Sequence, residues 1–210
     1  MFDAVVVEPT QPADSAVIWL HGLGASGHDF EPALPLLGLQ STATRFIFPH
    51  APQIPVTVNR GMVMPAWYDI LAMLPERQIA LEDLEASVKT VHTLIDEQMA
   101  QGIAAEKIFI VGFSQGGAVA YHSALSYPHG LAGVAALSTY IAEYPAIERA
   151  LAPQNSKIPV WVGHGIEDDV VPLHLGQQAM EWLKARAWPV DYKTYPMGHE
   201  VVEALSLIHI

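Results

Sequence analysis

A serine stands between glycines in the stretch VGFSQGG, which covers residues 111–117. Gly112, Ser114 and Gly116 form the pattern GxSxG, in which the serine occupies a sharp turn between a strand and a helix and exposes its hydroxyl. Glycine at the flanking positions allows a closer backbone approach than a Cβ would permit. The apolar run KIFI precedes the motif and AVAYHSAL follows it, as this interpretation requires. We therefore predict that Ser114 is a nucleophile.

A glycine-rich helix start or a phosphate-binding turn is the alternative interpretation of the same stretch. A dinucleotide-binding turn needs the pattern GxGxxG and, further along the chain, a carboxylate for the ribose. The sequence around this motif supplies neither feature. Chemistry at the serine is therefore the favoured interpretation.

A serine hydroxyl is a poor nucleophile unless a neighbouring base takes its proton and an acid orients that base. Where this motif occurs, the order along the chain is serine, acid, histidine. YPMGHE places His199 directly after the last predicted strand, and IEDDVVP offers Glu167, Asp168 and Asp169 after a buried strand. We predict His199 as the base and favour Asp168 as the acid, with Asp169 as its main competitor.

Acyl transfer also needs hydrogen-bond donors for an oxyanion, and backbone amides fixed in advance commonly supply them. One donor is expected from the residue after the nucleophile, which is Gln115. The other is expected from a loop after an early strand, and HGLGAS at residues 21–26 fits this position. Its two glycines would let the backbone turn inward, so that Leu23 supplies the second amide. An ordinary glycine turn is the alternative.

Apolar runs of strand length must position these residues. The runs at residues 4–9 and 15–22 are separated by a turn containing Pro and Asp, which predicts an antiparallel first hairpin. Further strands are predicted at residues 44–51, 107–114, 131–138, 158–165 and 190–196. Their near-continuous Val, Ile, Leu and Phe content is typical of parallel strands that are covered on both faces.

Segments with a helical period lie between the strands. Residues 81–102 predict an amphipathic helix that ends at Gly102, and residues 172–185 predict a second helix. The apolar stripe of the first consists of Leu81, Leu84, Val88, Val91, Ile95 and Met99, and that of the second of Leu175, Ala179, Trp182 and Leu183. This alternation predicts an α/β fold: a mostly parallel central sheet with helices on both faces.

The composition indicates one domain over residues 1–210, because 210 residues that are 51% hydrophobic can bury a sizeable core. The segment from Pro49 to Pro75 is rich in Pro and apolar residues, and we predict an irregular loop at about residues 50–75 beside the active site. Ten Lys and Arg against 22 Asp and Glu give a net charge of −12, which disfavours nucleic acid and anionic lipid surfaces.

The chain contains no cysteine, so disulfides and thiolate zinc sites are excluded. Its start has no basic segment leading into an apolar run, and no stretch approaches the length that spans a bilayer. We therefore expect a cytoplasmic protein that needs neither a membrane nor a metal or other cofactor.

Several motifs in sequence order resemble the carboxylesterase and acyl-protein thioesterase family of α/β-hydrolases. They are HGLGAS, PHAP, MPAWYDI, GFSQGGAVA, ALSTY, HGIEDDVVP and YPMGHE, and they cover nearly the whole length. The combination of GFSQGG with GHE is specific. The resemblance implies an α/β-hydrolase fold with Ser114 as nucleophile, Asp168 as acid, His199 as base, and the amides of Leu23 and Gln115 as oxyanion donors.

The resemblance also implies an enzyme: a serine carboxylesterase that cleaves short to medium acyl esters or thioesters of small molecules through an acyl-enzyme. It places the WYD segment, which begins at Trp67, beside an acyl channel. Ile70, Met73 and Val170 are then expected to be apolar walls that favour acyl chains over charged acids. The alternatives are an acyl-protein thioesterase and a non-catalytic binding protein with a displaced triad. A serine peptidase is disfavoured because no cap domain or propeller is present.

The chain departs from this family after GHE. Family members continue into a final helix packed on the sheet, whereas 11 residues follow His199 here and end in EALSLIHI. A shortened C-terminal end would expose the apolar surface that the helix covers, and such patches favour self-association. The sequence therefore predicts a homodimer that uses this surface.

Overall fold

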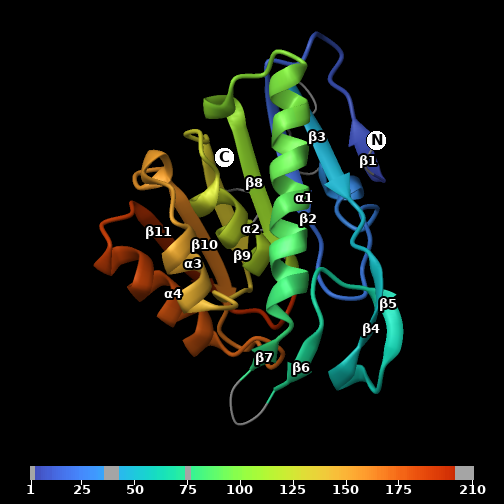
Figure 1. Cartoon of the computed structure of the whole chain (residues 1–210), viewed down its shortest axis with the longest axis vertical. Coiled ribbons are helices and arrows are strands. Elements are labelled where there is room, and N and C mark those ends of the chain that lie inside the picture. The colour runs from blue at the N-terminus through green and yellow to red at the C-terminus, as the bar shows by residue number, and fades with distance from the viewer. Residues whose placement is uncertain (1–2, 36–42, 74–76, 202–210) are drawn as a thin grey trace.

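A seven-stranded sheet forms the centre of the computed structural model, which describes residues 3–35, 43–73 and 77–201 (Figure 1). The strand order is β1-β3-β2-β8-β9-β10-β11. The strands are β1 (Ala4–Val7), β2 (Ser15–Leu20), β3 (Thr44–Pro49), β8 (Ile108–Phe113), β9 (Gly133–Leu137), β10 (Val160–Gly165) and β11 (Val190–Tyr195). All neighbours from β3 to β11 pair in parallel. The predicted α/β fold with a mostly parallel sheet is confirmed.

The first strand runs antiparallel, as predicted, but its partner differs from the predicted hairpin. β1 pairs with β3, with Ala4 opposite Pro49 and Val7 opposite Phe46, and it does not pair with β2. β3 lies between the two, because it pairs in parallel with β2 on its other edge. The short connection between β1 and β2 therefore passes over one strand, which its Pro and Asp content does not reveal.

Alternating side chains divide the buried residues between the two faces of the sheet. On β2, Ile18 and Leu20 join one apolar cluster, whereas Val17 and Trp19 join another. The other central strands alternate in the same way, because successive side chains of a strand point to opposite faces. Both faces of the sheet are therefore apolar, as the continuous hydrophobic runs predicted.

The described α-helices all pack against the first of these clusters. They are α1 (Leu81–Ala100), α2 (Gln115–Ser126), α3 (Tyr144–Ala150) and α4 (Leu173–Ala185). Figure 1 shows α1 crossing in front of the sheet, where it contacts β2. Next to the second cluster lies the 3-10 helix η1 (Glu31–Ala33), whose following residue Leu34 is part of it. Within the described residues, the expected α-helical cover is thus seen on one face.

The two helices predicted from periodicity are present. α1 buries Leu84, Val91 and Ile95, and Gly102 follows its end with φ +95°, a conformation that suits glycine. α4 begins one residue after Pro172, and its buried face includes Ala179 and Leu183. Further 3-10 helices are η3 (Thr57–Asn59), η4 (Ala105–Lys107) and η5 (Pro153–Asn155).

The segment predicted as an irregular loop contains regular structure. Two antiparallel pairs of short strands are found in and just beyond it: β4 (Gln53–Val56) with β5 (Met62–Pro65), and β6 (Ile70–Ala72) with β7 (Gln78–Ile79). Pro55 within β4 and Pro65 at the end of β5 obscure the alternation that would otherwise mark these strands. Figure 1 shows both pairs beyond one end of the central sheet.

The shortened C-terminal end falls on residues 202–210, which lie outside the described residues. The homodimer inferred from it therefore stays a prediction. Among the helices that the structure describes, none combines the length and the apolar character needed to cross a bilayer.

Candidate active site

Ser114 occupies the turn between the end of β8 and the start of α2. Its backbone has φ 54° and ψ −121°, a strained combination for a residue with a side chain. Two hydrogen bonds hold the turn: the Ser114 amide donates to the Leu137 carbonyl at 2.9 Å, and the Thr139 hydroxyl donates to the Ser114 carbonyl at 2.6 Å. Neighbouring residues of β9 and its following loop therefore maintain the strain.

Glycine is required on both sides of this serine because the backbone passes too closely for a Cβ. A Cβ on Gly112 would lie 2.3 Å from the carbonyl oxygen of Gly116, and one on Gly116 would lie 2.4 Å from that of His21. These contacts bring the start of α2 against the ends of β8 and β2. The GxSxG pattern thus has the steric cause that the sequence suggested.

His199 and Asp168 meet Ser114 at the carboxyl ends of the strands. His199 follows β11 and Asp168 follows β10. The distance from His199 Nε2 to Ser114 Oγ is 2.9 Å, and that from His199 Nδ1 to Asp168 Oδ2 is 2.8 Å. Because an ionised carboxylate accepts hydrogen bonds, Nδ1 carries the proton and Nε2 accepts from the serine hydroxyl. This is the geometry of a nucleophile, a base and an orienting acid.

Burial distinguishes Asp168 from the neighbouring acids. Its carboxylate accepts from the amides of Val170 at 3.0 Å and Val171 at 2.7 Å through Oδ1, which leaves Oδ2 for the histidine. Glu167 and Asp169 are exposed, whereas Asp168 is buried. The structure therefore brings the favoured acid to His199 and leaves its main competitor in solvent.

Leu23 and Gln115 both line the cavity that contains the Ser114 hydroxyl. Gln115 is the first residue of α2, where an amide has no acceptor within the helix and the helix dipole favours negative charge. The loop of Leu23 is held by a hydrogen bond of 2.8 Å from the Gly24 amide to the Pro65 carbonyl. Both residues thus have positions that suit amide donors to an oxyanion.

His21, the first residue of HGLGAS, stabilises the same loop through its side chain, which the motif alone did not indicate. Its Nε2 accepts a hydrogen bond of 3.1 Å from the Ala51 amide, so the proton resides on Nδ1, which donates to the Gly22 carbonyl at 2.8 Å. Burial lowers the pKa of His21 and favours this neutral form. A buried neutral histidine therefore holds the peptide next to Leu23.

Trp67 supports the site from behind. Its indole Nε1 donates to the His21 carbonyl at 2.8 Å, and its amide donates to Gln115 Oε1 at 2.8 Å. Gln115 Nε2 in turn donates to the Tyr68 carbonyl at 2.8 Å. Trp67 is buried and is not part of the described lining of the cavity. The structure therefore places Trp67 against the loop that contains Leu23 and outside the cavity lining, which differs from the expected place beside an acyl channel.

The cavity at Ser114 has a volume of about 430 Å³. Ile70, Met73 and Val170 line it, as expected from the sequence. Ile70 is buried, whereas Met73 and Val170 are 42% and 49% exposed. Further lining residues that the sequence analysis missed are Val58, Asn59, Arg77, Phe113, Tyr140 and Val171. Phe113 could have been found from its place inside the GxSxG motif.

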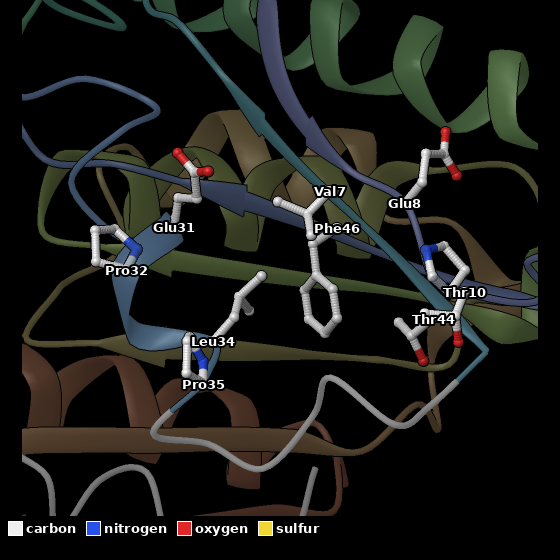
Figure 2. A pocket seen from close by; sticks show the side chains of 10 residues that line it. Val7, Glu8, Thr10, Glu31, Pro32, Leu34, Pro35, Thr44 and Phe46 are labelled. Carbon is white, nitrogen blue, oxygen red and sulfur yellow. The ribbon is translucent and has the colours of Figure 1, made fainter.

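A larger cavity of about 720 Å³ lies elsewhere, between β1, β3 and the segment around η1. Figure 2 shows Leu34 and Phe46 near its centre, with the carboxylates of Glu8 and Glu31 pointing away from them. No residue of the Ser114 site lines this cavity. Within residues 3–35, 43–73 and 77–201, no group of three His, Asp or Glu side chains is placed to hold a metal ion. The candidate active site is therefore identified by the side chains of Ser114, His199 and Asp168 and not by the size of its cavity.

Comparison with known proteins shows which family the chain belongs to. The phospholipase/carboxylesterase family model matches residues 1–206. The chain belongs to this family. A probable carboxylesterase of Oryza sativa subsp. japonica is 37% identical over 191 residues, which cover 89% of this chain and 72% of that protein. Acyl-protein thioesterase 1 of Gibberella zeae is 37% identical over 198 residues, which cover 90% and 84%.

Solved structures also resemble this chain over most of its length. SOBER1 of Arabidopsis thaliana superposes with a TM-score of 0.86 at 34% identity, over 91% of this chain and 93% of that one. Acyl-protein thioesterase 2 of Zea mays superposes with a TM-score of 0.81 at 27% identity, over 96% and 93%. The resemblance noted in the sequence is confirmed, and with it the α/β-hydrolase fold.

Proposed function

We propose that this chain is a serine carboxylesterase that hydrolyses short to medium acyl esters, including thioesters, through an acyl-enzyme intermediate. The observation that carries the proposal is the continuous chain of hydrogen bonds from Ser114 Oγ through His199 to Asp168, at 2.9 and 2.8 Å. Membership of the phospholipase/carboxylesterase family and relatives named carboxylesterase and acyl-protein thioesterase support the same reaction class.

In the acylation step, Ser114 Oγ attacks the carbonyl carbon of the ester while its proton passes to His199 Nε2. Asp168 stabilises the imidazolium that results, because its carboxylate already accepts the Nδ1 proton. The electron pair of the carbonyl double bond moves to oxygen. When the tetrahedral intermediate collapses, the bond to the alcohol or thiol breaks, and the leaving group takes the proton from Nε2.

In the deacylation step, water attacks the acyl-enzyme. His199 Nε2 removes a proton from the water as the new carbon–oxygen bond forms. Collapse of the second tetrahedral intermediate breaks the bond to Ser114 Oγ, which recovers its proton from Nε2. The free acid leaves and the resting state returns.

The oxyanion of each intermediate is stabilised by the amides of Leu23 and Gln115. Donors that are fixed before the reaction need no reorganisation when the charge develops, which makes them effective in a site shielded from water. The hydrogen bonds of His21, Trp67 and the Gln115 side chain support this arrangement, because they fix both peptide segments from behind.

The acyl chain is bound by Ile70, Met73 and Val170. All three line the cavity that contains Ser114. The volume of this cavity, about 430 Å³, lies within the usual range for small-molecule sites. Thioesters and oxygen esters pass through the same tetrahedral intermediate, so we expect both to be cleaved. Rates for matched esters and thioesters over a series of chain lengths measure the preference.

The test is hydrolysis of aryl esters by the wild type and by Ser114→Ala. Residues of a triad act as a unit, so we expect kcat/KM to fall by several orders of magnitude. Ser156→Ala is the matched control, because Ser156 is an exposed serine after η5 and is absent from the cavity lining. Equal rates of hydrolysis by the wild type and by Ser114→Ala would disprove the proposal.

Covalent labelling separates this proposal from a non-catalytic binding protein. An aryl phosphonate forms a bond from phosphorus to Ser114 Oγ and expels its aryloxide only where a base accepts the hydroxyl proton. We expect fast labelling of one serine per chain, and loss of labelling in Ser114→Ala. A wild-type chain that binds esters but is labelled no faster than free serine would be a binding protein.

A further inference from the structure

Arg77 is the one Lys or Arg side chain in the described lining of the cavity at Ser114. The same described lining contains no Asp or Glu. Among the residues that the structure describes, none of the ion pairs includes Arg77. A guanidinium therefore faces an otherwise mostly apolar cavity, and the proposed esterase reaction gives it no task.

Two contacts hold the guanidinium in place. Its Cζ lies 4.1 Å from the centre of the Tyr140 ring, and one of its terminal nitrogens donates to the Val170 carbonyl at 3.3 Å. The Tyr140 hydroxyl is hydrogen-bonded to the buried Tyr68 hydroxyl at 2.7 Å, which fixes the ring beneath the guanidinium. Neither contact neutralises the positive charge. Within residues 3–35, 43–73 and 77–201, the Val170 carbonyl is the acceptor recorded for the five N–H donors of Arg77.

Arg77 lies next to residues that are expected to bind the acyl chain. Val170, whose carbonyl it contacts, is one of the expected acyl walls, and Met73 lies close to Arg77 in the sequence and lines the same cavity. A planar guanidinium binds a carboxylate through two parallel hydrogen bonds, and hydrogen bonds between charged groups are stronger than those between neutral groups. An acyl chain that follows Met73 and Val170 and ends in a carboxylate would reach the guanidinium.

We propose that Arg77 is a specificity-determining residue that selects esters whose acyl chain carries a second, free carboxylate, as in monoesters of dicarboxylic acids. This inference rests on the proposed esterase function. It modifies the sequence-based expectation that the cavity favours uncharged acyl chains, because that expectation considered the apolar walls without Arg77. The net charge of −12 repels anionic substrates from the molecule as a whole, so acceptance of a carboxylate depends on this local cation.

The test compares two aryl esters of the same dicarboxylic acid, one with a free terminal carboxylate and one with that group capped as a primary amide. Adipate and longer acids are suitable, because shorter carboxylates attack their own ester. The measured quantity is the ratio of kcat/KM for the anionic ester to kcat/KM for the capped ester. Arg77→Met removes the charge and keeps an apolar side chain, and Arg77→Lys keeps the charge without the planar fork.

We expect Arg77→Met to lower this ratio about ten- to hundredfold, the range for loss of a hydrogen bond between charged groups. The loss should appear as a higher KM for the anionic ester, with the capped ester little affected. Arg77→Lys should lie between the wild type and Arg77→Met. Arg149→Met controls for the change in net charge, because Arg149 is exposed on α3 and lies outside the cavity lining.

The outcomes are distinct. An unchanged ratio in Arg77→Met, or an equal loss for both esters, overturns the inference, since the second result indicates a structural role for Arg77. If an aryl ester whose acyl chain ends in phosphate has the same kcat/KM as the ester that ends in carboxylate, the selectivity for carboxylate is overturned. If the wild type and Ser114→Ala hydrolyse the capped ester equally slowly, the proposed function itself fails. If hydrolysis of the capped ester depends on Ser114, the esterase function holds, and a failure of the Arg77 test then concerns the Arg77 inference alone.

Discussion

At the scale of single residues, Asp168 shows how the surroundings assign a role. Three acidic side chains stand in succession, and their chemistry is nearly identical. Asp168 differs because it is buried and because the amides of Val170 and Val171 occupy one of its oxygens. The other oxygen is thereby left to His199. Exposed carboxylates in the same turn have no comparable constraint.

Substitution of neighbouring acids tests this assignment. Asp168→Asn places an amide where Nδ1 of His199 needs an acceptor, and a rotated amide would stabilise the wrong tautomer. We expect kcat/KM for aryl esters to fall by about three to four orders of magnitude. Asp169→Asn is the matched control, because Asp169 is exposed, and it should retain nearly full activity. Similar losses in both variants would show that the order of the acids has been misassigned.

The sequence was sufficient for some site residues and insufficient for others. Ser114 and His199 could be predicted because a motif and a strand end specify their surroundings locally. The selection of Asp168 over Asp169 could only be a preference, since a shift of one residue along a turn exchanges a buried side chain for an exposed one. Tyr140 belongs to the quoted motif ALSTY, but nothing in that motif indicates that its ring lines the cavity. Arg77 could not be found, because it lies outside all of the quoted motifs.

At the scale of elements, the unit that matters is β8, the turn at Ser114 and α2. The helix starts directly against the ends of β2 and β8, and the backbones lie so close together there that no Cβ fits at Gly112 or Gly116. The sequence predicted this unit well because the glycine spacing has a steric cause. It predicted the β1 partner and the strands of residues 53–79 poorly, because pairing between strands depends on contacts that are remote in the sequence.

Gly116→Ala tests the close approach at the start of α2. The added Cβ would lie 2.4 Å from the His21 carbonyl oxygen and 2.5 Å from that of Leu20, and both are backbone atoms that cannot rotate away. We expect the free energy of unfolding to fall by about 1–3 kcal/mol. Gly130→Ala is the control, since its nearest contact would be an ordinary 3.6 Å. Urea unfolding measures both, and equal stability of the two variants would contradict the steric argument.

At the scale of the whole molecule, buried histidines link stability to pH. Burial lowers the pKa of His21, His92, His122 and His164, and that of His122 falls to about 4. In each case the unfolded chain binds a proton more readily than the folded one. Stability is therefore complete above the ordinary histidine pKa of about 6.5 and is lost as the pH falls below it.

Of these four histidines, His122 should make the largest single contribution, because its pKa is lowered the most. Between pH 6.5 and its folded pKa of about 4, the expected loss is about 3 kcal/mol of unfolding free energy. Urea unfolding at pH 7.5 and pH 4.5 measures this loss, and His122→Leu should reduce the difference between the two values. His174→Gln is the control, because His174 is exposed on α4. A His122→Leu protein with the pH dependence of the wild type would contradict this account.

The three groups of the site come from β8, β10 and β11, which lie far apart along the chain. Ser114 and His199 are separated by 85 positions, and among the described strands β11 is the outermost on its side of the sheet. A partly synthesised or partly folded chain can thus form the serine turn and still lack its base until that edge strand docks. Turnover by this molecule therefore reports that its sheet has been assembled through to β11.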